Sequence, residues 1–212
     1  MFPELTEQKS TYIFTTISRF CQFTTSRFFY SPSAIRRCLI KWIMNKFYTK
    51  KGDKGKSFFA GKKFGKASAE LEALGELDEL ASLLGIVKNR PLEADFKKTI
   101  AGIQGDLSAI SANIADLASG GKYKTPEFPA EKTAKIEQII ENYQKNLKNI
   151  KSFIIPGENE NSAWFDFARA VCRRAERAVV GLAIKRKIPP EILSYLNRLS
   201  SLLFVMARAA AR

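Results

Sequence analysis

Apolar residues recur every three or four positions over most of the chain from residue 66 onward, which is the period of an amphipathic helix. In the longest run the spacings alternate between four and three, as in the buried seam of a long bundle helix: Phe96, Ile100, Ile103, Leu107, Ile110, Ile114 and Leu117. The same period predicts four further helices, at 66–87, 136–147, 163–186 and 190–206. Proline and glycine mark the connections between them.

Five predicted helices, short connections and no convincing sheet predict an all-α, up-and-down five-helix bundle. We expect this helical domain to cover residues 44–212. Its first part, TKKGDKGKSFFAGKKFG at 49–65, contains four glycines that interrupt any helix. A loop is therefore expected there, with short extended pieces.

Residues 1–43 differ in composition from the rest of the chain. They hold six lysines and arginines against two glutamates, and they are rich in Phe, Ser and Thr. This composition resembles an organellar transit peptide. The interpretation that we favour is an N-terminal extension without a fold, or a start codon assigned too early. We expect a cytoplasmic protein, or a mitochondrial matrix protein if the segment is a genuine transit peptide.

The net charge of +14 indicates an anionic partner: nucleic acid, a membrane surface or a phosphorylated small molecule. Three scattered cysteines do not form a disulfide framework. The sequence contains no histidine, which removes the commonest general base and metal ligand. No apolar run reaches 18 residues, so we expect no transmembrane helix and no membrane partner.

Positive charge is concentrated in the fourth predicted helix, around VCRRAERA at 171–178. Arg169, Arg173 and Arg177 recur every four residues on one face, with Glu176 beside them. One interpretation is a solvated face with local Glu–Arg pairing. The other is a clamp for a polyanion, because guanidinium forks match the geometry of phosphate. The density of arginines favours the clamp.

The glycine-rich loop is a second candidate for phosphate binding. TKKGDKGKS combines accessible backbone N–H groups with several lysines, but its spacing is not that of a Walker A motif. A basic surface loop is the alternative. Lys66 stands at the expected start of the next helix and is a candidate phosphate ligand.

Two polar residues interrupt otherwise apolar helix patterns. Asp78 is spaced from Leu74 and Ala81 like a residue of the apolar side, where a carboxylate would need a charged partner. An arginine of the fourth helix, in the same or a neighbouring subunit, is the candidate. The alternative is an exposed carboxylate at the edge of the stripe. Asn197 is either a ligand-binding residue or a polar residue on the solvent-exposed side of its helix.

Together these motifs resemble the PduO-type ATP:cob(I)alamin adenosyltransferases. The matching stretches follow the order of the family: YTKKGDKG (48–55), EALGELDELASLLG (72–85), FIIPGE (153–158), CRRAERAVVGL (172–182) and YLNRLSSLLFVMAR (195–208). The resemblance implies a homotrimer with sites between adjacent subunits. It implies an enzyme that transfers the 5′-deoxyadenosyl group of ATP to the cobalt of cob(I)alamin and releases triphosphate, in the biosynthesis or salvage of adenosylcobalamin.

The resemblance also implies roles for individual residues. Arg173, Arg177 and Asp78 are the implied catalytic residues, and Asp78 pairs with Arg173 across the subunit interface. Phe153 and Asp78 are the implied corrinoid contacts, with Phe153 packing under the corrin and displacing its lower ligand. Mg²⁺ is held through the ATP phosphates. The implied ATP contacts are Thr49, Lys50, Lys51, Gly52, Asp53, Ser57, Lys66, Arg173, Arg174, Glu176, Arg177 and Asn197.

The chain departs from the family pattern at several positions. Ser201 stands where Asp usually follows RLS, Glu158 replaces the second glycine of PGG, and Asp166 and Trp164 are unusual. These departures keep open a non-catalytic sensor or chaperone that holds ATP or adenosylcobalamin. A reductase and a cobalamin-dependent mutase are possible partners. We expect no nucleic-acid partner, because the charges do not form a broad stripe with interleaved aromatic residues.

Overall fold

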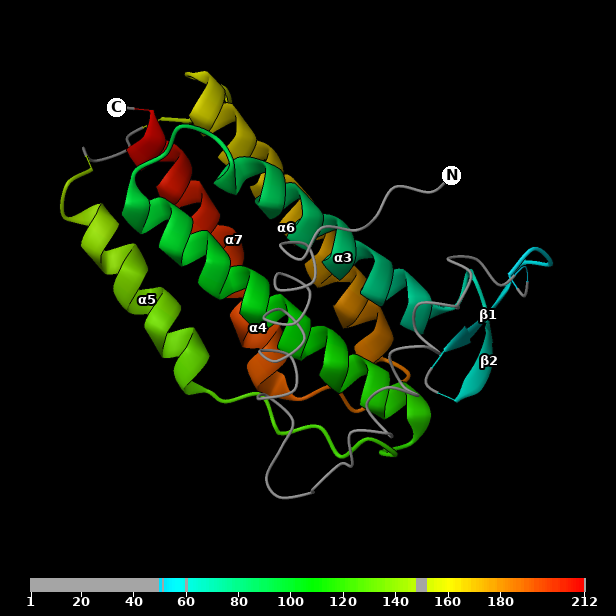
Figure 1. The fold of residues 1–212 in the computed structure, drawn as a ribbon. Coiled ribbons are helices and arrows are strands. Elements are labelled where there is room, and N and C mark those ends of the chain that lie inside the picture. Colours follow the sequence, from blue (N-terminus) through cyan, green and yellow to red (C-terminus); the bar gives the residue numbers. More distant parts are fainter. Residues whose placement is uncertain (1–49, 51, 60, 148–151, 212) are drawn as a thin grey trace, which may run out of the picture. The chain divides into compact units, whose positions relative to one another are not determined.

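The computed structural model describes residues 50, 52–59, 61–147 and 152–211, so the prediction for residues 1–43 lies outside the described part. Figure 1 shows the fold, in which two short strands precede five helices. The elements are β1 (Lys56–Phe59), β2 (Lys62–Gly65), α3 (Ala69–Lys88), α4 (Ala94–Ser119), α5 (Glu131–Gln144), α6 (Glu160–Ala183) and α7 (Pro190–Ala210).

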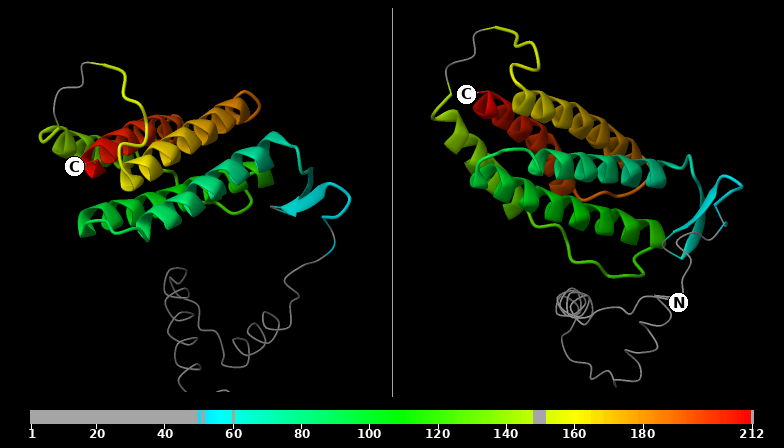
Figure 2. Two further views of the ribbon diagram at one scale, coloured as in Figure 1. Left: turned by 90° about the horizontal axis from the view of Figure 1, so that it is seen from above. Right: turned by 45° about the horizontal axis from the view of Figure 1, so that its top comes forward.

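The five helices lie along one another as a bundle (Figures 1 and 2), which confirms the predicted all-α class and helix number. Helix α6 packs against α3 and α7, α7 also packs against α5, and α3 packs against α4. The expectation of no sheet was incomplete. Strands β1 and β2 form an antiparallel hairpin in which Lys56 pairs with Gly65 and Phe59 with Lys62. None of the described helices is long and apolar enough to cross a membrane.

The predicted helix seams form the core. In α4 six of the seven seam residues are buried, and Leu117 packs against the core from a partly buried position. In α7 the buried side runs through Ile192, Leu196, Leu199 and Leu203, all fully inaccessible to solvent. The alternating three- and four-residue spacing therefore identified the packed faces correctly.

Helix ends were predicted less well than helix faces, because caps decide them. Helix α3 starts at Ala69 rather than residue 66, since the Ser68 side chain accepts a hydrogen bond from the N–H of Leu71. Helix α6 starts at Glu160 rather than residue 163. Asn159 and Ser162 form a reciprocal capping box there, which adds a turn to a stretch that reads as a loop.

Candidate functional site

The arginine-rich face of α6 has the arrangement expected from its spacing. Arg173 and Arg177 are exposed, and Arg169 is half-buried on the same side. The opposite side of the helix is packed into the core: Ala168, Val171, Cys172, Ala175, Val179 and Leu182. Within the described part of the chain, neither Arg173 nor Arg177 forms an ion pair with a carboxylate. Both guanidinium groups are therefore available to an anion from outside the chain.

A groove of about 250 Å³ lies beside this face, between α5, α6 and α7. Arg169 and Arg173 line it together with the hydroxyls of Ser200 and Ser201 and the ring of Phe204. The guanidinium carbon of Arg169 lies 5.8 Å from the centre of the Phe204 ring, within the range of a cation–π contact. The groove thus combines positive charge, hydroxyl groups and one aromatic face.

Arg174 is engaged differently from Arg173 and Arg177. Its Nε donates to Glu76 Oε2 at 2.6 Å, and its Nη2 pairs with Glu79, so the side chain joins α6 to α3. Hydrogen bonds to Glu79 and then Glu76 raise the pKa of Arg174 above its ordinary value. The local Glu–Arg pairing of the alternative interpretation is therefore not what Arg174 makes, since both of its carboxylate partners belong to α3.

Helices α6 and α7 bring Glu176 and Asn197 together. Asn197 Nδ2 donates to Glu176 Oε1 at 2.9 Å, and Arg198 Nη1 donates to Asn197 Oδ1 at 3.1 Å. Arg198 is held in turn by Glu137 of α5, with 2.8 Å between Nε and Oε1. The amide of Asn197 is therefore oriented from both sides next to the arginine-rich face.

The glycine-rich loop folds back on itself before α3. The N–H of Gly55 donates to the carbonyl of Gly52 at 3.2 Å, and the N–H of Lys66 donates to the carbonyl of Gly55 at 2.9 Å. A Cβ placed on Gly52 would lie 3.4 Å from Nζ of Lys66, so the lysine side chain extends over this glycine. Asp53 is exposed and Ser57 is half-buried in the same loop and hairpin. Lys50 has a left-handed backbone with φ 56°.

Two of the expected ATP contacts, Thr49 and Lys51, lie outside the described residues. Asp78 is exposed, while its neighbours Leu77 and Leu80 are buried. Asp78 therefore lies exposed at the edge of the apolar stripe, and none of the described arginines of the same chain forms an ion pair with it.

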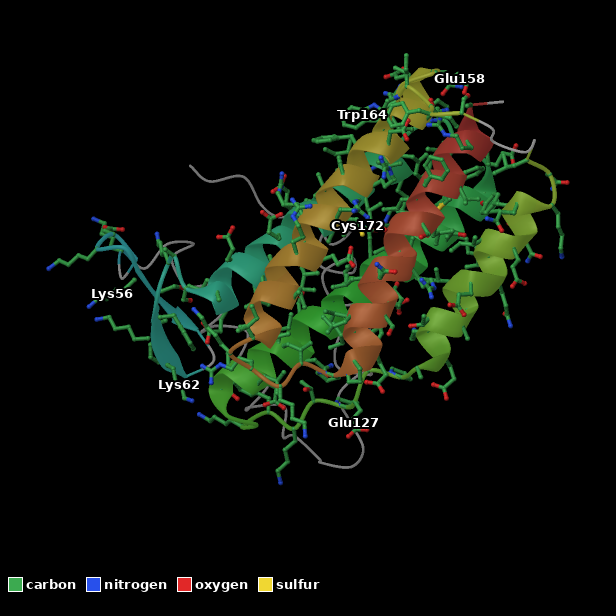
Figure 3. The ribbon with its side chains drawn as sticks, turned by 180° about the vertical axis from the view of Figure 1, so that it is seen from behind. Lys56, Lys62, Glu127, Glu158, Trp164 and Cys172 are labelled. Atoms are coloured by element: carbon green, nitrogen blue, oxygen red, sulfur yellow. The ribbon has the colours of Figure 1, made fainter. Side chains whose placement is uncertain are left out.

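The loop with Phe153 lies at the end of the bundle opposite the hairpin. Figure 3 shows Glu158 and Trp164 at one end, Lys56 and Lys62 at the other, and Cys172 between them. Phe153 itself is 91% exposed.

Sequence reasoning missed the residues that hold this loop. Asp166 and Arg208 are buried and form an ion pair with each other, although they lie 42 residues apart. A signal was present: Arg208 stands in the apolar last helix, and Asp166 follows the fully buried Phe165. A charged residue on the buried side of a helix needs a partner of the opposite charge.

Comparisons with known proteins agree with the motifs. The model of the family described as cobalamin adenosyltransferase matches residues 47–210. The chain is 37% identical over 172 residues to the corrinoid adenosyltransferase MMAB of Homo sapiens, covering 78% of this chain and 69% of that protein. It is 34% identical over 167 residues to the corrinoid adenosyltransferase of Bacillus subtilis, covering 77% and 85%.

Solved structures are similar as well. One is a phenylalanine-to-alanine variant of a PduO-type ATP:corrinoid adenosyltransferase from Lactobacillus reuteri, complexed with cobalamin and ATP. It superposes with a TM-score of 0.72 at 31% identity, covering 78% of this chain and 93% of that one. An arginine-to-lysine variant from the same organism, complexed with ATP, gives a TM-score of 0.71 at the same identity.

Proposed function

The chain belongs to the cobalamin adenosyltransferase family, and from this premise we propose how its residues bind and activate the substrates. The enzyme transfers the 5′-deoxyadenosyl group of ATP to the cobalt of a reduced corrinoid. The electron pair of Co(I) forms the Co–C5′ bond, the C5′–O bond breaks, and its electrons leave with triphosphate. ATP and the corrinoid are both substrates.

The observation that carries the proposal is the pair of arginines without carboxylate partners, Arg173 and Arg177. Co(I) is itself a strong nucleophile, so the reaction requires no protein base and the lack of histidine is no obstacle. The protein has to orient C5′ toward cobalt and stabilise the charge that develops on the leaving triphosphate. Exposed guanidinium forks on one helix face are suited to this, because they bind phosphate oxygens bidentately.

Glu176 and Asn197 act beside these arginines. Their mutual hydrogen bond fixes the amide of Asn197, which leaves the nucleotide a preformed polar contact rather than a mobile one. We place Arg174 at the edge of the ATP site. Its guanidinium also holds Glu76 and Glu79, so it couples the site to α3.

The glycine-rich loop holds the phosphates in this proposal, through Thr49–Gly52, Ser57 and Lys66. Lys66 already lies over Gly52, where the lack of a side chain lets a phosphate approach the backbone. Mg²⁺ enters with the phosphates and retains several waters, as it commonly does in nucleotide sites. Asp53, exposed in the same turn, is the carboxylate available to it.

Each site lies between two subunits of a homotrimer in our proposal. The hairpin and the Phe153 loop lie at opposite ends of the bundle (Figures 1 and 3), and α6 with its 24 residues is about 36 Å long. One chain therefore supports its phosphate loop and its corrinoid loop far apart, whereas a neighbour can bring the two together. Asp78, exposed on α3, then reaches Arg173 of the neighbouring subunit and borders the corrinoid.

Phe153 provides the lower face of the corrinoid site. Its ring is exposed on a loop and free to contact a flat macrocycle. An apolar ring beneath cobalt excludes a lower ligand and thereby eases the reduction of Co(II) to Co(I). A reductase that supplies this electron and a cobalamin-dependent mutase that receives the product complete the proposal. Their compartment is the cytoplasm, or the mitochondrial matrix if residues 1–43 are a transit peptide.

The activity is tested by mixing the protein with ATP, Mg²⁺ and chemically reduced cobalamin and following the absorption spectrum. Adenosylcobalamin and triphosphate should appear in equal amounts. Tight binding of adenosylcobalamin without turnover would instead support a sensor or chaperone.

The role of the unpaired arginines is tested by Arg177→Ala. We expect turnover to fall by at least about 100-fold, because a group that stabilises the leaving charge is removed. The oligomeric state should not change. Arg186→Ala is the matched control, since this arginine follows α6 and is paired with Glu70 at 2.7 Å. Wild-type turnover in Arg177→Ala would refute the clamp.

A further inference from the structure

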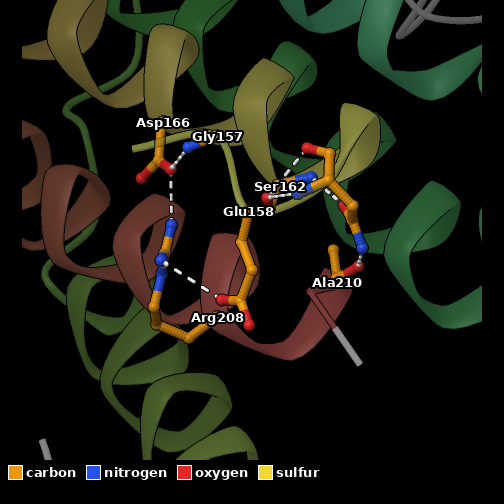
Figure 4. Close-up of polar contacts among 7 residues, drawn as sticks. Gly157, Glu158, Ser162, Asp166, Arg208 and Ala210 are labelled. Atoms are coloured by element: carbon orange, nitrogen blue, oxygen red, sulfur yellow. Dashed lines mark hydrogen bonds and ion pairs between the residues drawn. The ribbon is translucent and has the colours of Figure 1, made fainter. Parts of the chain in front are cut away.

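A buried ion pair joins α6 to α7 and contacts Gly157 and Glu158 of the loop that follows Phe153 in the sequence (Figure 4). Nη2 of Arg208 donates to Oδ2 of Asp166, and the two residues are only 6% and 7% exposed. A buried charge is costly without its partner, so each residue fixes the other. Neither residue belongs to the proposed ATP site.

The same pair holds the backbone of the loop. The N–H of Gly157 donates to Oδ2 of Asp166 at 3.2 Å. Gly157 has φ 94°, a left-handed conformation that a side chain would strain. The carboxylate of Glu158 lies 3.9 Å from Nη1 of Arg208, and the Asn159 amide donates to the carbonyl of Ala210 at 2.9 Å. Three consecutive residues are thus tied to α6 and α7.

Among the described residues, nothing holds Phe153 as Asp166 and Arg208 hold residues 157–159. Its side chain is 91% exposed and that of Ile155 is 80% exposed, so neither is held by packing against the core. The position of the ring is therefore set by the backbone of the loop. Pro156 restricts that backbone between the ring and the tied residues. Whatever holds residues 157–159 consequently determines where the Phe153 ring lies.

Arg208 also has unused capacity for hydrogen bonding. Its Nε and Nη1 are buried and have no hydrogen-bond acceptor in the described structure. Glu158 is exposed and, at 3.9 Å, forms an ion pair but no hydrogen bond. A small inward movement of the loop would convert this contact into a charge-assisted hydrogen bond.

We propose that Asp166 and Arg208 are positioning residues for Phe153 and thereby determine how well the enzyme handles corrinoids that carry a lower axial base. The inference rests on the proposed function of Phe153. Cob(II)alamin carries its lower base on cobalt, and the ring has to take the place of that base before Co(II) accepts an electron. Cob(II)inamide lacks the base, and Co(I) no longer binds it. Only the reaction that starts from cob(II)alamin therefore depends on the Asp166–Arg208 ion pair.

The test uses Asp166→Asn, which keeps the shape and an acceptor for Gly157 but removes the charge that faces Arg208. With ATP and reduced flavin as the one-electron donor, we expect adenosylation from cob(II)alamin to slow by about 10- to 100-fold, the cost of a misplaced group. Adenosylation from cob(II)inamide, and from cobalamin reduced beforehand to Co(I), should change less than about twofold, since no base is displaced there.

A spectroscopic measurement separates positioning from a general loss of structure. When cob(II)alamin is added to the ATP-loaded wild-type enzyme, its spectrum should change to that of cobalt without a lower base. In Asp166→Asn the base-bound spectrum should persist. The proposal would be overturned if Asp166→Asn slowed adenosylation from cob(II)alamin and from cob(II)inamide equally. It would also be overturned if cob(II)alamin showed the same spectral change in the variant as in the wild-type enzyme.

Two further variants keep the test informative if Asp166→Asn folds poorly. Glu158→Gln removes an exposed charge, so the bundle should stay folded, and we expect a loss of about two- to fivefold restricted to cob(II)alamin. Asp106→Asn is the matched control. Its carboxylate pairs with Lys132 at 2.7 Å and accepts from Tyr195, which lies about 20 Å along α7 from Arg208. It should lower stability without changing the ratio of the two rates.

The two proposals fail in different ways. If the wild-type protein does not adenosylate cobalamin reduced beforehand to Co(I), the proposed function is wrong. If it does, and Asp166→Asn and Glu158→Gln both keep the wild-type ratio of rates, only the positioning role is wrong.

Discussion

At the scale of single residues, the described arginines fall into two groups, those that pair with a carboxylate and those that do not. Arg174, Arg186, Arg198 and Arg208 each pair with a carboxylate of another segment. The face with Arg173 has no such partner among the described residues. Paired arginines hold helices together, and arginines left without a carboxylate on a folded surface are the ones that an anionic substrate can recruit.

The spacing in the sequence predicted which arginines share a face, because the helical period fixes that locally. It could not predict their partners. Glu76 lies 98 residues from Arg174, and Asp166 lies 42 from Arg208, so these pairs depend on how helices pack rather than on any local pattern. For the same reason the sequence could not decide whether Asp78 is buried or exposed, because the packing of neighbouring helices determines where the buried side of α3 ends.

Cys172 gives a prediction at this scale. Burial raises the pKa of its thiol to about 12, so at about pH 8 almost none of it is thiolate, the reactive form. We expect an alkylating reagent to leave the peptide that contains Cys172 unmodified in the folded protein, and to modify it fully in denaturant. Peptide mass spectrometry measures both, and modification in the folded protein would contradict the buried position.

At the scale of elements, a polar cluster joins three helices within the otherwise apolar bundle. Asp106 of α4 accepts from the hydroxyl of Tyr195 in α7 at 2.8 Å and pairs with Lys132 of α5 at 2.7 Å. Tyr195 is fully buried, so its hydroxyl has no access to water. The cluster therefore specifies how α4, α5 and α7 align along the bundle axis.

Replacing the hydroxyl tests this cluster. Tyr195→Phe should lower the free energy of unfolding by about 1–2 kcal/mol, because Asp106 loses a hydrogen-bond donor in a partly buried site. Urea unfolding followed by circular dichroism measures the change. Tyr123→Phe is the matched control, since the Tyr123 side chain is exposed and should contribute little. Equal stability of the two variants would argue against a structural role for the cluster.

The connection after α4 gives an element-scale prediction about pH. Asp116 accepts from the N–H groups of Tyr123 and Thr125 at 2.7 and 3.0 Å. The Tyr123 N–H holds the pKa of Asp116 below its ordinary value of 3.8, although burial opposes this. A lowered folded-state pKa means that the carboxylate stabilises the fold above pH 3.8 and loses this effect as the pH falls further.

We therefore expect Asp116→Asn to melt at a lower temperature than wild type at pH 7, with the difference shrinking below about pH 4 as the wild-type carboxylate is protonated. Thermal melting across this range measures it. Glu127→Gln changes an exposed carboxyl of the same connection and should melt like wild type at every pH. A difference that persists unchanged at low pH would contradict the assignment.

At the scale of the whole molecule, the five-helix architecture was predictable because each helix carries its own buried stripe. The hairpin was not predictable, because its strands have only four residues each and exposed and less exposed positions do not alternate along β2. The placement of the hairpin and of the loop with Phe153 at opposite ends of the bundle was not predictable from the pattern either.

A complementation experiment tests the proposal that the site is shared between subunits. If Asp78 of one subunit serves the Arg173 of its neighbour, Asp78→Ala and Arg173→Ala are each inactive alone. When the two chains are coexpressed, every mixed trimer contains one site with both native residues. Random mixing should then restore about one quarter of the wild-type activity, since a cyclic trimer has three equivalent junctions. No recovery at all would show that both residues act within one chain.

The hairpin has a consequence for the rate at which the molecule exchanges its amide protons. Two short strands are barely stable alone, and Phe58, 70% exposed, adds little burial to them. Deuterium should therefore enter residues 56–65 far sooner than the buried turns of α7, which open only when the whole bundle unfolds. ATP should slow uptake in the hairpin selectively. Part of the nucleotide's binding energy is then consumed in ordering this segment, which makes the hairpin a local reporter of whether the phosphates are in place.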